Sequence, residues 1–95
     1  YASISKVVKL TDESAAIFWE KRNYTKKNGD RYVGTYYCII DQYGKILTGE
    51  TQIKNAKLSN NDNMIYYNNR VYWTTNDEKK TTKLVLHELE LPTKN

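Results

Sequence analysis

Residues 36–40, Tyr-Tyr-Cys-Ile-Ile, limit more than any other stretch what this chain can fold into. Successive side chains of a β-strand point to opposite faces of its sheet. Tyr36 and Cys38 would therefore face one side, and Tyr37 and Ile39 the other. A strand with one face in water alternates apolar and polar residues, which this stretch does not do. We therefore expect other parts of the protein to cover both faces of this strand.

A turn follows that strand. Residues 41–44, Asp-Gln-Tyr-Gly, place Asp first and Gly last, as a type I turn prefers. The carboxylate of Asp41 can accept backbone N–H groups in such a turn, and we assign it this structural role. Residues 45–50 would return as the next strand, with Gly49 at a bulge or at the strand end.

The composition favours an all-β antiparallel fold. Aromatic residues make up 13% of the chain and there is a single Pro. Aromatic and β-branched residues are enriched in strands, whereas Pro interrupts them. The pair Asn68-Asn69 is a plausible two-residue hairpin turn, since Asn tolerates positive φ. Strands are expected at residues 3–10, 15–22, 32–41, 45–50, 64–67, 70–75 and 84–88, with a polar tip at 23–31.

The second half of the chain repeats features of the first. Lys-Val-Val-Lys-Leu at residues 6–10 is echoed by Lys-Asn-Ala-Lys-Leu at 54–58, and Ile-Phe-Trp ending at Trp19 is echoed by Val-Tyr-Trp ending at Trp73. A repeat of about fifty residues with four strands is typical of a propeller blade. Chance similarity between two β segments is the alternative. On the repeat interpretation, the two tryptophans hold equivalent packing positions.

We therefore expect residues 1–95 to form a single module with approximate repeats at 4–51 and 52–91. The order of an aliphatic-aromatic-Trp strand, a polar tip and then Tyr-Tyr-Cys-Ile-Ile-Asp-Gln-Tyr-Gly-Lys-Ile-Leu resembles repeats of bacterial β-propeller proteins, many of them exported. The resemblance covers roughly residues 3–91. It implies two four-stranded antiparallel blades from the C-terminal part of a larger propeller, at the cell surface or outside the cell. The glycine and Trp-Asp signatures of the common propeller families are absent, so it implies no subfamily.

Two blades alone would leave apolar faces open, so further blades or copies of the same chain are the expected partners. The second repeat also lacks a fourth strand, because Pro92 follows Leu91. Residues 2–6, or a strand of another chain, could fill that edge. The sequence begins at Tyr1, and we expect a processed protein or a piece of a longer chain whose targeting signal is absent here. It has no apolar run of membrane-spanning length.

The sequence contains no catalytic constellation, so we expect a protein that is not an enzyme. Cys38 is the only cysteine and is interpreted as a small buried hydrophobe. His87 is the only histidine and is interpreted as a structural or rim residue, because apolar residues flank it on its own face. The Asn-Asn-Asp-Asn stretch at 60–63 offers oxygen ligands but lacks the pattern of a calcium loop. We therefore predict no metal or cofactor.

Four loop tyrosines are the best candidates for ligand binding, because tyrosine combines an apolar ring with a hydroxyl suited to protein or carbohydrate. They are Tyr24, Tyr43, Tyr66 and Tyr67. The alternative is that these rings only cover the ends of a blade.

The predicted function is a binding or scaffold module, and two other functions are open. A small basic β-barrel could bind single-stranded nucleic acid through aromatic stacking and lysine contacts. The net charge is only +4 and the lysines are scattered, which argues against a concentrated phosphate-binding face. The chain could also belong to an exported enzyme whose active residues lie outside it.

Overall fold

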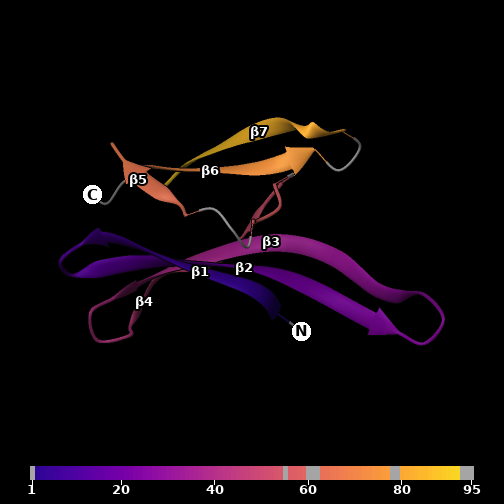
Figure 1. Ribbon diagram of the computed structural model, residues 1–95. Coiled ribbons are helices and arrows are strands. Elements are labelled where there is room, and N and C mark those ends of the chain that lie inside the picture. The colour runs from indigo at the N-terminus through magenta and orange to yellow at the C-terminus, as the bar shows by residue number, and fades with distance from the viewer. Residues whose placement is uncertain (1, 55, 60–62, 78–79, 93–95) are drawn as a thin grey trace.

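The computed structural model describes residues 2–54, 56–59, 63–77 and 80–92, and these form two antiparallel sheets without a helix. The all-β antiparallel prediction is confirmed. The first sheet has the strand order β1-β2-β3-β4 and the second β5-β6-β7, and they lie as two layers (Figure 1). The strands are β1 (Ala2–Thr11), β2 (Ser14–Thr25), β3 (Gly29–Asp41), β4 (Ile46–Ile53), β5 (Ile65–Tyr67), β6 (Arg70–Asp77) and β7 (Lys80–Glu90).

Both predicted turns are confirmed. Asp41 Oδ1 accepts the backbone N–H groups of Tyr43 and Lys45, each at 2.9 Å, and Gly44 has a φ of +84°. Asn68 and Asn69 have φ values of +53° and +64°, the left-handed conformation that a tight two-residue hairpin turn needs. Gly49 lies where the β3–β4 register is irregular, as expected for a bulge.

The core lies between the two sheets. Phe18 of β2 and Tyr37 of β3 point inward from the first sheet, and their rings stack with centroids 5.6 Å apart. Phe18 also contacts the ring of Trp73 from β6, at 6.0 Å between centroids. Val71 and Ile39 extend this cluster. Each strand contributes alternate residues, so one face of each sheet forms the core.

The other face of the first sheet is only half-buried. Trp19, Tyr36 and Cys38 point away from the core, and no strand of the described ranges covers them. Within this chain, the predicted cover is therefore present on one face of the strand and not on the other. Cys38 was expected to be buried, but it is only half-buried. These side chains shield one another instead. The rings of Trp19 and Tyr36 stack at 6.2 Å, and Lys21 Nζ lies 4.5 Å from the centre of the Tyr36 ring.

The expected equivalence of the two tryptophans is wrong. Trp73 is buried against Phe18, whereas Trp19 lies on the outer face. The two strands are one residue out of phase, and a shift of one residue moves a side chain to the opposite face. The sequence similarity therefore matched a tryptophan of the core with a tryptophan of the outer face.

The sequence echo of residues 6–10 at 54–58 is not matched by the structure, because residues 54 and 56–59 form a turn and an irregular linker whereas residues 6–10 lie in β1. Two further expectations are corrected. Residues 2–6 belong to β1, which pairs with β2, so they do not fill the edge of the second sheet. The polar tip is shorter than 23–31, because β2 and β3 pair as far as Thr25 and Gly29. The two separate sheets also differ from the closed barrel required by the nucleic-acid alternative.

Candidate ligand-binding cleft

The inner faces of both sheets change from apolar to polar along their length. On β2 the inward row runs from Phe18 to Glu20 and Arg22. On β6 the inward residue after Trp73 is Thr75, whose hydroxyl lies within hydrogen-bond distance of His87, the β7 residue opposite Trp73. The polar ends of the two rows lie toward the same end of the molecule. Water and ligands are therefore easier to accommodate between the sheets at this end than in the apolar half.

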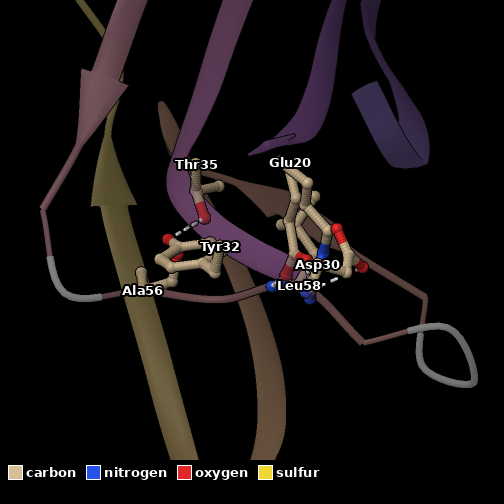
Figure 2. Close-up of polar contacts among 7 residues, drawn as sticks. Glu20, Asp30, Tyr32, Thr35, Ala56 and Leu58 are labelled. Carbon is tan, nitrogen blue, oxygen red and sulfur yellow. Dashed lines mark hydrogen bonds and ion pairs between the residues drawn. The ribbon is translucent and has the colours of Figure 1, made fainter. Parts of the chain in front are cut away.

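A bulge in β3 turns Tyr32 toward this polar end. Lys21 pairs with Gly34 but Arg22 pairs with Tyr32, so Val33 is an extra residue on β3. A bulge reverses the alternation of side chains beyond it. The Tyr32 hydroxyl consequently lies 2.6 Å from Oγ1 of the buried Thr35, on the inner face (Figure 2).

The linker between the sheets is held by its backbone at three successive residues. The Ala56 carbonyl accepts the Tyr32 hydroxyl at 3.4 Å, and the Lys57 carbonyl accepts Trp73 Nε1–H at 2.8 Å. The Leu58 N–H donates to Glu20 Oε2 at 2.8 Å. Figure 2 shows the linker passing Tyr32 and Glu20. The linker therefore has a defined path although it belongs to neither sheet.

Glu20 is a buried charge, only 1% exposed, and its second oxygen accepts Arg22 Nη2–H at 3.0 Å. Arg22 Nη1 also lies 3.7 Å from Asp30 Oδ2. A buried carboxylate is costly unless it is paired and hydrogen-bonded, and Glu20 meets both conditions. Its contacts link β2 to the linker, which gives this residue a structural role.

His87 is half-buried at the same end of the molecule. Its ring stacks on Trp73 with centroids 5.2 Å apart, and its Nε2 lies 2.7 Å from the Thr75 hydroxyl. Burial lowers the pKa of His87, which favours the neutral imidazole. These contacts agree with the predicted structural or rim role.

These elements enclose a cleft of about 740 Å³ between the ends of β3, β4, β6 and β7 and the linker. The lining combines apolar surface with hydrogen-bonding groups. The apolar lining side chains are Val33, Ile53, Ala56, Leu58 and Val85. The polar lining side chains are Tyr32, Gln52, Lys54, Lys57, Ser59, Thr75, Asn76 and His87. Amide, hydroxyl, imidazole and ammonium groups in one concave site can orient a polar ligand by hydrogen bonds.

The four predicted tyrosines do not form one surface. Tyr24 is exposed near the end of β2, and Tyr43 lies in the turn at the opposite end of β3. Tyr66 packs against the core, whereas its neighbour Tyr67 is exposed. The cleft contains none of the four. Whether any of them binds a ligand stays a prediction.

Sequence reasoning overlooked the cleft, but part of its signal was present. The alternating row that begins with Ala16 and Phe18 continues into Glu20, so a charge follows apolar residues on the same face. That pattern indicates a polar end to the core. The bulge at Val33, which turns Tyr32 inward, has no comparable local signal.

The described residues hold no group of three His, Cys, Asp or Glu side chains that could bind a metal ion. Residues 60–62 of the oxygen-rich stretch lie outside the described residues. In the described ranges no helix is both long and apolar enough to span a bilayer. No family model, curated protein or solved structure matches the chain.

Proposed function

We propose that this chain is a non-catalytic binding module that recognises carbohydrate in the cleft between its two sheets. The observation that carries the proposal is a concave site with many hydrogen-bonding side chains, beside a linker whose backbone makes three hydrogen bonds to side chains of the two sheets. Restrained walls lower the entropy cost of ordering a site when a ligand binds. Carbohydrate was one of the two ligand classes expected from the sequence.

The lining favours carbohydrate over protein. Gln52, Asn76 and Thr75 supply amide and hydroxyl groups that can pair with sugar hydroxyls. Small-ligand sites have volumes of roughly 300–1,000 Å³, and this cleft lies in that range. Protein partners bind chiefly through buried aromatic and Arg anchors in deep apolar pockets, whereas this cleft carries hydrogen-bonding and ammonium groups beside its apolar walls.

The test is a titration of the isotope-labelled chain with a panel of neutral and acidic oligosaccharides, followed by NMR chemical shifts. Shifts should cluster at the ends of β3, β6 and β7. Gln52→Ala removes a lining amide and should weaken binding about fivefold, the effect of one net hydrogen bond. Gln42→Ala is the matched control in the turn at the far end of β3 and should leave binding unchanged. Shifts centred on Tyr43 or Tyr24 would contradict the proposal and favour the loop tyrosines.

A specific observation supports a second function, assembly with further sheets. Leu84 and Leu86 of β7 are 66% and 67% exposed, and no described strand pairs with the second edge of β7. Both sheets are meanders of sequential strands, which is also the layout of propeller blades. We propose that the chain belongs to a larger exported bacterial β-propeller, with further blades or copies of itself at these faces.

Solution mass tests assembly. The chain should associate as its concentration rises, and the double substitution Leu84→Lys with Leu86→Lys should suppress association. Val7 is the matched site on β1, since it is an exposed apolar residue at the edge of the first sheet. Val7→Lys should have a smaller effect if β7 is the contact. A monomer at every concentration, with a cooperative melt, would contradict assembly between copies.

A further inference from the structure

The charged side chains among the described lining residues of the cleft are those of Lys54 and Lys57. No carboxylate occurs among these lining residues, and burial lowers the pKa of His87 and so favours its neutral form. A concave site with charge of one sign raises the local concentration of ligands of the opposite sign. The lining therefore discriminates between ligands by charge as well as by hydrogen bonding.

Lys57 is the better placed of the two lysines. Its carbonyl accepts the Trp73 indole N–H, and the flanking residues Ala56 and Leu58 are held to β3 and β2. Its Nζ lies 5.0 Å from the centre of the Tyr32 ring, within the range of a cation–π contact. The backbone under this ammonium group is fixed, so its side chain enters the cleft from a defined position.

The described carboxylates nearest to the linker already have a basic partner. Glu20 is buried and accepts hydrogen bonds from Leu58 and from Arg22. Asp30 lies within ion-pair distance of the same Arg22. Arg22 thus offsets negative charge on the β2 side of the linker.

We propose that the cleft selects carbohydrates that carry an acidic group, a carboxylate or a sulfate, and that Lys54 and Lys57 bind this group. This inference rests on the proposed carbohydrate-binding function and adds the ligand class. Gln52 and Asn76 contact the neutral hydroxyls, and the two ammonium groups supply charge-assisted hydrogen bonds to the acidic group.

The experiment compares an oligogalacturonate with its fully methyl-esterified form, which has the same backbone without the charge. A sulfated oligosaccharide tests whether the cleft prefers sulfate or carboxylate. An acidic peptide tests whether the cleft binds acidic groups on a peptide rather than on a sugar. Calorimetric titration should give at least tenfold tighter binding of one acidic sugar than of its neutral counterpart. That difference should shrink as salt rises, because screening weakens charge interactions.

Lys54→Gln and Lys57→Gln should each weaken binding of the acidic sugar about tenfold and binding of the neutral form much less. Lys57→Arg keeps the charge and should retain most of the affinity. Lys45→Gln removes an exposed lysine beyond the turn at the far end of β3 and should have no effect. Urea unfolding of each variant confirms that the chain is folded.

Each outcome distinguishes the inference from the function on which it rests. Equal affinity for acidic and neutral sugars overturns the charge selection and leaves carbohydrate binding intact. Tight binding of the acidic sugar that survives both glutamine substitutions overturns the assignment to this cleft. Failure of every sugar to bind overturns both the function and the inference. An acidic peptide that binds more tightly than the sugars overturns the ligand class.

Discussion

Glu20→Ala is the substitution that should most clearly expose how the two sheets are held together. Glu20 is almost completely buried, and its two oxygens accept the Leu58 N–H and the Arg22 guanidinium. Alanine would leave that N–H without its partner and Arg22 without its nearest anion. The result should be a linker detached from β2 in a chain that still folds.

The magnitude follows from the surroundings of each partner. Breaking a buried ion pair by removing one member costs about 3–5 kcal/mol. The Arg22 side chain is 26% exposed and keeps Asp30 at 3.7 Å, so the loss should lie near the lower limit, about 3 kcal/mol. Glu20→Gln retains an oxygen for the Leu58 N–H and should cost less, about 1–2 kcal/mol.

Urea unfolding followed by tryptophan fluorescence measures these free energies, because Trp73 is buried in the core. With a slope of about 1.5 kcal/mol per molar urea, the Glu20→Ala midpoint should fall by about 2 M. Glu50→Ala is the matched control, because the Lys21–Glu50 pair lies at 3.6 Å on the surface and should contribute less than about 1 kcal/mol. If the free energy of unfolding of Glu20→Ala lies within 1 kcal/mol of that of the unsubstituted chain, the linker is not held by this carboxylate.

Three further substitutions test other parts of the structure. Ile39→Asp buries an unpaired charge in the core and should abolish cooperative unfolding by circular dichroism, whereas Ile40→Asp, on the half-buried outer face, should leave a folded chain. Trp73→Phe loses a hydrogen bond and core volume and should lower the free energy of unfolding by about 2–3 kcal/mol. Trp19→Phe should lower it by less than about 1 kcal/mol. Equal decreases in urea unfolding would mean that the two tryptophans are equivalent. Burial lowers the pKa of His87, so the unfolded chain takes up a proton at higher pH than the folded chain. The free energy of unfolding should therefore decrease as the pH falls through about 6.5 toward the folded-state pKa, and His87→Gln should flatten this dependence in melts across that range.

Local signals in the sequence accounted for the class of fold and for its turns. Asp41 with Gly44, and the pair Asn68-Asn69, satisfy their turns through short-range backbone geometry and side-chain hydrogen bonds. Such features depend on a few neighbouring residues, so a sequence pattern can identify them. The same holds for the strands, whose β-branched and aromatic residues favour extended backbone.

Which face of each strand is buried depends on long-range packing and was harder to predict. Residues 36–40 are apolar on both sides, yet only the side of Tyr37 meets the second sheet. Trp19 and Trp73 share a sequence pattern but differ in register. The cleft needs the bulge at Val33 and the pairing of Glu20 with a linker residue 38 positions away, and no local pattern encodes either feature.

The linker bonds have a consequence for how substitutions could change the chemistry of the cleft. All three use backbone atoms of Ala56, Lys57 and Leu58, so the path of the linker does not depend on what side chain residue 57 carries. Ala56 and Leu58 are constrained by burial, whereas the position between them can vary without loosening the fold. A single codon could therefore exchange an ammonium for an amide, a hydroxyl or a ring at the mouth of the cleft. Evolution, or an engineer, could change the groups that line the cleft there at little cost in stability.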